Sequence, residues 1–353
     1  MLKDWNKARK WQTQNANALI KAFKASSVEP CVEEIYINRS IEVLCTYEWK
    51  RTSLEKDSGE KPAIYVPGFG NRFSAPSLPH RMKEDTGTAW QDQHLYRVFQ
   101  QQFEPLFQAM SVMNPGVRFN DVNVVIDFTE ATGKADTDGY HRAIWYALGP
   151  ITLVVRLEVD AFLDDEKREA TDDLFHGYKT VSGPNHRAGI RHENATSVVL
   201  GGCYVSHAAV AELKVNRGSD EQLWAGHYRN NIVADRTTGG FGPTEDLTRK
   251  ERKERGELIA KNKAEGKKGG YMTIHSAKPK DVRKECLEWD RHNGGSLQKL
   301  AGLFSGLIDA MKQVEGDKAM LREESRGGEL KLYQGGEDMV DALPEEIVNI
   351  FWD

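Results

Sequence analysis

Two acidic residues, Glu158 and Asp160, interrupt an otherwise apolar stretch of the sequence. On a β-strand, residues two apart project from the same face, so these two carboxylates would point together. Carboxylates on a buried strand repel each other and lose their hydration, so a positive group is needed to hold them ionised. Hard divalent cations such as Mg²⁺ or Mn²⁺ take carboxylate oxygens as ligands. The pair therefore predicts a metal site.

A second charged segment, Glu212-Leu213-Lys214, lies in another apolar stretch further along the chain. Its two charged residues would again share one face of a strand. Glu212 could complete the metal site, while Lys214 could orient or deprotonate an attacking water and stabilise charge on a phosphate. The expected metal ligands are Glu158, Asp160 and Glu212. The same three residues and Lys214 are the expected catalytic residues.

An acidic residue followed by Glu-x-Lys on the next strand is the pattern of the PD-(D/E)xK nucleases. The pattern amounts to four residues, here Glu158, Asp160, Glu212 and Lys214. A cross-strand ion pair on a half-exposed sheet would produce the same kind of spacing. The pattern alone leaves both interpretations open.

The composition is that of an ordinary globular protein, with 39% hydrophobic and 29% charged residues in a chain of 353. The net charge of −5 neither announces nor excludes a nucleic-acid partner, because a local basic face matters more than the total. There is no apolar run of about 18 residues and no secretory signal, so we expect no membrane association and a cytoplasmic or nuclear location. The four cysteines form no C-x-x-C pair, so neither a zinc site nor a disulfide framework is expected.

The acidic segments need a sheet to position them, and the middle of the chain predicts one. Near-continuous apolar runs such as 151–155 are typical of strands that are buried on both faces, so helices should flank the sheet. Apolar residues at helical spacing predict helices over 4–25, 93–113 and 279–314, the last with a break at Gly294-Gly295. The expected strands cover residues 32–49, 63–66, 122–128, 143–148, 151–162, 197–204, 208–215 and 330–333. The expected fold class is α+β, with a mixed central β-sheet flanked by helices.

A change of composition marks residues 248–270, which are rich in lysine, arginine and glutamate and poor in large apolar residues. Such a segment is typical of a solvated helix or a mobile insertion. Its basic residues could instead follow a phosphate backbone. We expect residues 1–353 to form a single domain that contains this charged insertion.

Three segments together resemble the DXO family of RNA 5′-end decapping exonucleases. These segments are Arg142–Gly149, Leu153–Asp160 and Ala211–Lys214. In that family a strand bearing an arginine and a leucine-glycine pair leads to a Glu-x-Asp strand, and a Glu-x-Lys strand follows. The chain is also similar to a group of fungal proteins with this core, through Val66-Pro67-Gly68, Glu104-Pro105-Leu106 and the stretch from Trp224 to Ile232. The resemblance extends over residues 40–310.

The resemblance implies a DXO-like version of the PD-(D/E)xK fold, with Mg²⁺ or Mn²⁺ as the cofactor. The family also has an arginine and a Gly-x-Glu glutamate upstream of the Glu-x-Asp strand, and position alone suggests Arg142 and Glu130 for these. A glutamine expected downstream of the Glu-x-Lys strand could be Gln222, although the closest register places His227 there. Arg142, Gln222 and His227 are therefore the expected substrate-binding residues.

The expected function is metal-dependent hydrolysis of RNA 5′ ends, by decapping, pyrophosphohydrolase or 5′-exoribonuclease action. The alternative is a catalytically degenerate relative that binds RNA or a protein partner. A DNA nuclease of the wider superfamily is a third possibility. Aromatic residues could stack on unpaired bases; the candidates are Trp90, Tyr140, Trp145, Trp224 and Tyr228.

Overall fold

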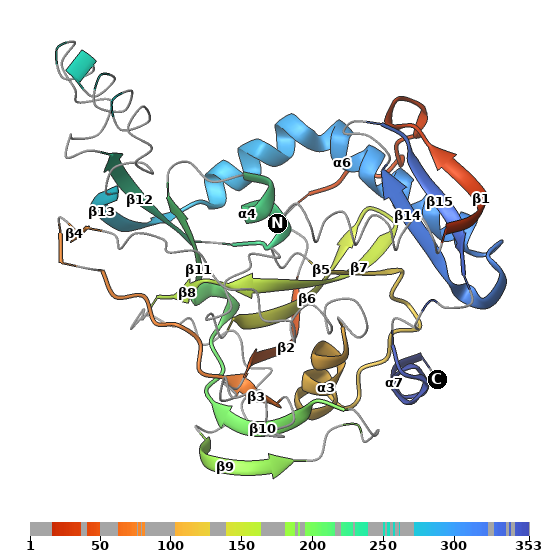
Figure 1. Cartoon of the computed structure of the whole chain (residues 1–353), viewed down its shortest axis with the longest axis horizontal. Helices are drawn as coiled ribbons and strands as arrows, with labels where there is room; N and C mark the ends of the chain where they lie inside the picture. Colours follow the sequence, from red (N-terminus) through yellow and green to blue (C-terminus); the bar gives the residue numbers. More distant parts are fainter. Residues whose placement is uncertain are drawn as a thin grey trace.

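A computed structural model provides the structure of this chain. It describes residues 16–36, 41–49, 63–75, 77–78, 80–81, 103–127, 139–163, 181–187, 190, 195–215, 220–228, 230–238, 272–323, 328–336, 339 and 343–352, together with isolated helical positions between 250 and 261. The described strands form three sheets, and the described helices cover the largest of them on both sides (Figure 1). The predicted α+β fold with a mixed central sheet is confirmed.

The largest sheet has seven strands in the order β5-β7-β6-β2-β3-β10-β9. The β5/β7 and β3/β10 pairs are parallel and the other pairs are antiparallel. Strands β6 and β7 form a hairpin whose two-residue turn contains Gly149 at a φ of 59°, a backbone conformation that glycine adopts without strain. The strands are β2 (Glu42–Trp49), β3 (Ala63–Gly68), β5 (Val124–Asp127), β6 (Tyr140–Leu148), β7 (Ile151–Val159), β9 (Val181–Arg187) and β10 (Ser197–Gly202).

A five-stranded sheet continues from the end of β7, with the order β4-β13-β12-β11-β8. Strand β8 follows β7 after the single residue Asp160, so the chain passes directly from one sheet to the other at the predicted acidic pair. The strands are β4 (His80–Arg81), β8 (Ala161–Phe162), β11 (Val210–Val215), β12 (Asn230–Thr238) and β13 (Met272–Asp281).

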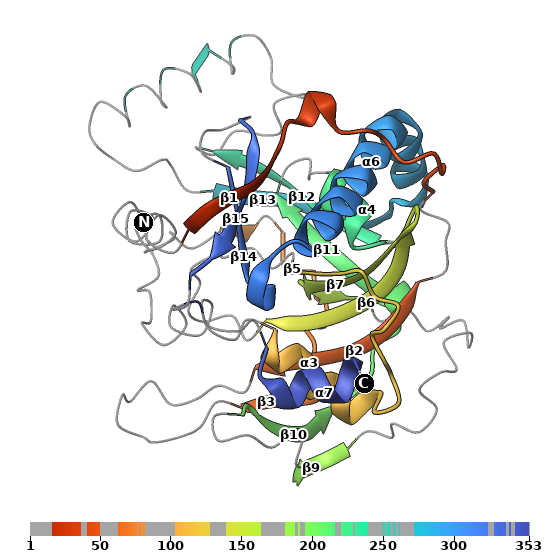
Figure 2. The ribbon, with the colours of Figure 1, turned by 90° about the vertical axis from the view of Figure 1, so that its right-hand side faces the viewer.

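A three-stranded sheet joins early and late parts of the chain. Strand β1 (Ala16–Phe23) pairs antiparallel with β15 (Leu330–Gly335), which pairs with β14 (Ala319–Glu323). Phe23 and Leu332 are buried in a small cluster with Ala310 of the long helix α6 (Arg283–Met311). Figure 2 shows this sheet beside one end of α6.

Two apolar clusters fill the two faces of the seven-stranded sheet. On one face, β6 and β7 pack with α4 (Asp220–Ala225) and α6. On the other face, strands β2, β3, β6 and β7 pack with α3 (Glu104–Met113) and α7 (Glu345–Trp352). Figures 1 and 2 show α4 and α6 on one side of β6 and β7, and α3 and α7 on the other. Three short 3₁₀ turns complete the described elements: η1 (Ala25–Ser27), η3 (His207–Ala209) and η4 (Glu315–Asp317).

Several sequence expectations about the elements are wrong. The helix expected over 4–25 is a strand over residues 16–23, because this segment pairs with β15 and packs on α6; residues 1–15 lie outside the described part. The helix expected over 279–314 has no break at Gly294-Gly295, and residues 279–281 belong to β13. The strand expected over 32–49 begins only at Glu42.

The remaining expected elements are found where the structure describes them. Strands occur within 63–66, 122–128, 143–148, 151–162, 197–204, 208–215 and 330–333, and the part of 93–113 that is described contains α3. Within the insertion at 248–270, the described positions are helical and carry the ion pairs Lys250–Glu254 and Lys253–Glu257. None of the helices in the described ranges combines the length and the apolar character required to cross a bilayer.

Candidate functional site

The carboxylate of Glu158 lies near the end of β7, beside the start of β6. Glu158 is the register partner of His141, and a Cβ atom on Gly139 would lie 2.9 Å from Glu158 Oε1 and 3.1 Å from His141 Cε1. A larger residue at position 139 would therefore displace the Glu158 carboxylate from its present place. Because His141 also contacts the ring of Tyr47, this carboxylate lies on the sheet face that packs with α3.

Asp160 and Glu212 are brought together by the pairing of β8 with β11. Val210 is opposite Phe162 and Ala211 is opposite Ala161, so the next antiparallel positions are Glu212 and Asp160. The backbone N–H of Leu213 donates to Asp160 Oδ2 at 2.8 Å. The two charged motifs, which are far apart in the sequence, therefore meet at this strand pair.

The hydroxyl of Tyr228 lies beside the Asp160 and Glu212 carboxylates. These three residues are called the acidic cluster below. The one hydrogen of the Tyr228 hydroxyl is within reach of two acceptors, the backbone carbonyl of Glu158 at 2.8 Å and the Glu212 carboxylate. Burial raises the pKa of Tyr228 most, and the negative charges of Glu212 and Asp160 raise it further. Tyr228 and Glu212 are only 3% and 2% exposed.

Arg142 brings a positive charge to the cluster from inside the core. Its side chain is fully buried on the face of β6 that packs with α4 and α6, opposite Leu157. Its Nη2 donates to the carbonyl of Val205 at 2.5 Å, and its Nη1 lies 3.3 Å from His207 Nδ1. The charge of Arg142 also lowers the pKa of Tyr228, against the larger effects that raise it.

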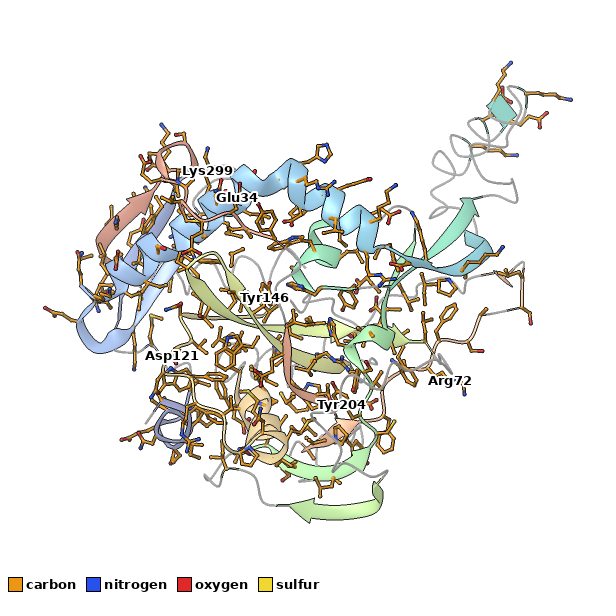
Figure 3. The ribbon with its side chains drawn as sticks, turned by 180° about the vertical axis from the view of Figure 1, so that it is seen from behind. Glu34, Arg72, Asp121, Tyr146, Tyr204 and Lys299 are labelled. Atoms are coloured by element: carbon orange, nitrogen blue, oxygen red, sulfur yellow. The ribbon has the colours of Figure 1, made fainter. Side chains whose placement is uncertain are left out.

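The guanidinium of Arg142 lies over the ring of Tyr204, with 5.8 Å between the guanidinium carbon and the ring centroid. Figure 3 labels Tyr204, and also Arg72, which pairs with Phe162 of β8 just beyond Asp160. Arg142 thus reaches the acidic cluster as a buried, hydrogen-bonded cation and not as a surface side chain.

His227 precedes Tyr228 in the turn between α4 and β12. It has a φ of 49°, which is unusual for a residue with a Cβ, and its ring lies 4.4 Å from that of Tyr146. Burial lowers the pKa of His227 to about 4, so the imidazole is neutral at pH 7. Its carbonyl lies 3.2 Å from His207 Nε2, which links the turn to Arg142 through His207.

The other expected site residues are described only in part or not at all. Lys214 belongs to β11 and Gln222 to α4, but their side chains lie outside the described part, as does the whole of Glu130. Their roles stay predictions. Tyr140, Trp224 and Tyr228 are buried in the core, so in this structure they are not exposed platforms for base stacking; Trp145 is half-buried, and Trp90 lies outside the described residues.

The donor set of the cluster suits a hard cation. Among the described residues, no three His, Cys, Asp or Glu side chains are grouped so that they could hold a metal ion. Asp160 and Glu212 nevertheless offer carboxylate oxygens, and Asn231, the register partner of Glu212 on β12, has a buried Oδ1 to which no described group donates a hydrogen bond. Two carboxylates and an amide oxygen are ligands of the type that Mg²⁺ or Mn²⁺ takes.

A family model described as "Domain of unknown function (DUF8563)" matches residues 18–131 and 127–255. The chain belongs to the DUF8563 family. The matched residues include both charged motifs and the turn that contains Tyr228, and they end before α6. No curated protein matches this DUF8563 member.

Two solved structures similar to the DUF8563 chain are those of S. pombe Rai1 with 3′-FADP. A triple mutant of Rai1 in that complex has a TM-score of 0.39 and 10% sequence identity, and the match covers 90% of this chain and 99% of that chain. Rai1 without these mutations, in complex with the same compound, has a TM-score of 0.37 and 10% identity, with coverage of 89% and 99%.

Proposed function

We propose that this chain is a metal-dependent hydrolase of phosphodiester or pyrophosphate bonds at RNA 5′ ends. The observation that carries the proposal is the meeting of Asp160 and Glu212 across β8 and β11, with the Leu213 N–H on the Asp160 carboxylate. The resemblance of the same segments to the DXO family supports the choice of RNA 5′ ends as the substrate.

The proposed metal ligands are Glu158, Asp160 and Glu212. In this structure the three carboxylates, all among the described residues, are not grouped around one point, so the Glu158 side chain would have to change position to join the other two on an ion. A bound Mg²⁺ or Mn²⁺ would polarise the phosphoryl oxygen and lower the pKa of an attacking water. Lys214, two residues after Glu212 on β11, is the residue proposed to orient that water or to stabilise charge on the phosphate.

The proposed roles of the substrate-binding candidates differ in kind. Arg142 would act through its charge on the buried cluster, since its Nη atoms already bond within the core. His227 would contribute as a neutral imidazole, because burial lowers its pKa to about 4. Gln222 remains a candidate for a direct contact with the substrate.

The decisive experiment compares 5′-triphosphate, capped and 5′-monophosphate RNAs, each incubated with the purified protein in Mg²⁺ or Mn²⁺. The test variant is Asp160→Asn with Glu212→Gln, and the matched control is Asp121→Asn with Glu315→Gln, two exposed acids elsewhere. We expect product that EDTA abolishes, that the test variant loses and that the control retains. Product that survives in the test variant would refute the assignment of these acids.

A second candidate function is binding of RNA or a protein partner without catalysis. The observation that favours it is the burial of Glu212, which is 2% exposed and hydrogen-bonded with Tyr228. Titration calorimetry separates the two candidates: no heat of Mn²⁺ binding, together with no product from any of the three RNAs, would favour the binding protein.

A further inference from the structure

Asn231 occupies the position beside Glu212 in the five-stranded sheet. Strand β12 lies between β11 and β13, with Asn231 opposite Glu212 on one side and opposite Lys280 on the other. Residues that are paired across neighbouring strands project from the same face of a sheet. The face is the one that carries Val210 into the cluster with α4 and α6, so Asn231 projects toward the same interior as Glu212.

The amide oxygen of Asn231 is buried and accepts no hydrogen bond from a described group. Asn231 as a whole is 5% exposed. The Nζ of Lys280 lies 2.5 Å from Glu285 Oε1, and the hydroxyl of Tyr228 donates to the Glu158 carbonyl. Buried amide oxygens normally accept a hydrogen bond, because the loss of hydration is otherwise not offset.

We propose that Asn231 contributes its amide oxygen to a divalent cation that Asp160 and Glu212 also hold. A cation satisfies the buried oxygen and offsets the repulsion between two neighbouring carboxylates at the same time. The neutral amide adds an oxygen ligand without a third negative charge in a buried place. This inference rests on the proposed function only in taking Asp160 and Glu212 as metal ligands.

A structural role for Asn231 makes the opposite prediction for the stability of the metal-free protein. If the amide were oriented the other way, its Nδ2 would donate to the Glu212 carboxylate and would stabilise the fold without any metal. Removal of the amide would then destabilise the metal-free protein. Under the proposal, replacement of the amide by an apolar side chain removes a buried oxygen without a donor and stabilises the metal-free protein.

The test uses the full chain with Asn231→Leu, Asn231→Asp and the control Asn123→Leu. Asn123 accepts a hydrogen bond from the backbone N–H of Thr152 at the start of β7, roughly 26 Å along the strand from Asp160. The thermal midpoint is measured in EDTA and in Mn²⁺, and the Kd for Mn²⁺ is measured by titration calorimetry. Neither the thermal midpoint nor the Kd for Mn²⁺ depends on RNA or on catalysis.

We expect Asn231→Leu to raise the midpoint in EDTA by about 2–4 °C and to weaken Mn²⁺ binding at least about tenfold. Asn231→Asp should lower the midpoint in EDTA, through repulsion with Glu212 and Asp160, and should tighten Mn²⁺ binding. Asn123→Leu should not raise the midpoint in EDTA and should leave the Kd for Mn²⁺ unchanged.

Three results would overturn the inference: no Mn²⁺ binding by the unmodified protein, a Kd for Asn231→Leu within twofold of the unmodified protein, or a lower midpoint of Asn231→Leu in EDTA. The RNA assay tests the proposed function independently of the Mn²⁺ titration. Mn²⁺ binding that depends on Asn231 without RNA hydrolysis would support the inference and refute the proposed function. RNA hydrolysis with unchanged Mn²⁺ binding in Asn231→Leu would support the proposed function and refute the inference about Asn231.

Discussion

Replacement of Tyr228 by phenylalanine should reveal how much the acidic cluster depends on one hydroxyl. The ring stays the same, but the Glu158 carbonyl loses its donor at 2.8 Å and the Glu212 carboxylate loses a hydrogen bond. A buried acceptor left without its partner costs about 1–3 kcal/mol, and more when the acceptor is charged. The hydroxyl has one hydrogen, which serves either acceptor at a time, and the Glu212 carboxylate is charged, so we expect Tyr228→Phe to lower the free energy of unfolding by about 2–3 kcal/mol, the value of one hydrogen bond to a charged group.

The matched control is Tyr146→Phe. Tyr146 is also buried, and its hydroxyl donates only to the neutral carbonyl of Ala225, at 3.2 Å. We expect this change to cost about 1 kcal/mol, the usual net value of one neutral hydrogen bond. Urea unfolding at pH 7 in EDTA, followed by tryptophan fluorescence, measures both variants without any contribution from a bound metal.

A double-mutant cycle with Glu212→Gln tests the link between the hydroxyl and the carboxylate. Residues in one hydrogen-bonded network show coupling energies of about 0.5–3 kcal/mol, whereas distant sites are additive. We therefore expect the double variant Tyr228→Phe with Glu212→Gln to be more stable than the sum of the single losses predicts. Additive losses, or a Tyr228→Phe variant no less stable than Tyr146→Phe, would refute the central place given to Tyr228.

Three further predictions concern residues around the site and the fold. His227 has a folded-state pKa of about 4 against an ordinary value of 6.5, so its contribution to stability is complete above pH 6.5 and is lost as the pH falls toward 4. Thermal midpoints at pH 7 and pH 5 should therefore differ less in His227→Asn, which keeps a residue that tolerates positive φ, than in the unmodified protein; an equal difference would contradict this. Gly139→Ala should displace the Glu158 carboxylate and weaken Mn²⁺ binding in calorimetry. Gly116→Ala, whose Cβ would meet nothing within 4 Å, should leave the Kd for Mn²⁺ unchanged. Equal Kd values for the two variants would show that the Glu158 carboxylate does not bind the metal. Gly202→Ala should strongly lower the free energy of unfolding, because its Cβ would collide with the Gly68 carbonyl and φ at this position is 91°. Gly294→Ala, in the middle of α6 with open space around it, should instead raise the free energy of unfolding by about 0.5–1 kcal/mol, as measured by urea unfolding. A less stable Gly294→Ala would contradict the account of that helix.

The sequence predicts the centre of the fold well because its strands are buried on both faces. The run from Ile151 to Val155 is apolar without interruption, and it becomes the strand between β5 and β6. The spacing of Glu158, Asp160 and Glu212 also places them on strands, as the structure confirms for β7 and β11.

The parts that could not be predicted depend on partners far away in the chain. Residues 16–23 have apolar side chains at helical intervals, yet they form a strand because β15 offers a hydrogen-bonding edge and α6 an apolar surface. Asn231 and Tyr228 gain their importance from the register of β11 with β12 and from the turn after α4. Local composition does not encode such registers, so neither residue stood out as a neighbour of the acidic cluster.

The pairing of β1 with β15 has a consequence for biosynthesis. Ala16 pairs with Gly335 and Phe23 with Leu330, so the two halves of this strand pair are separated by almost the whole chain. At a synthesis rate of roughly 5–20 residues per second, β1 leaves the ribosome about 15–60 s before its partner has been made. During that time the nascent chain can complete the strands of the central sheet, but β1 must wait, and the three-stranded sheet closes only after β15 has been made.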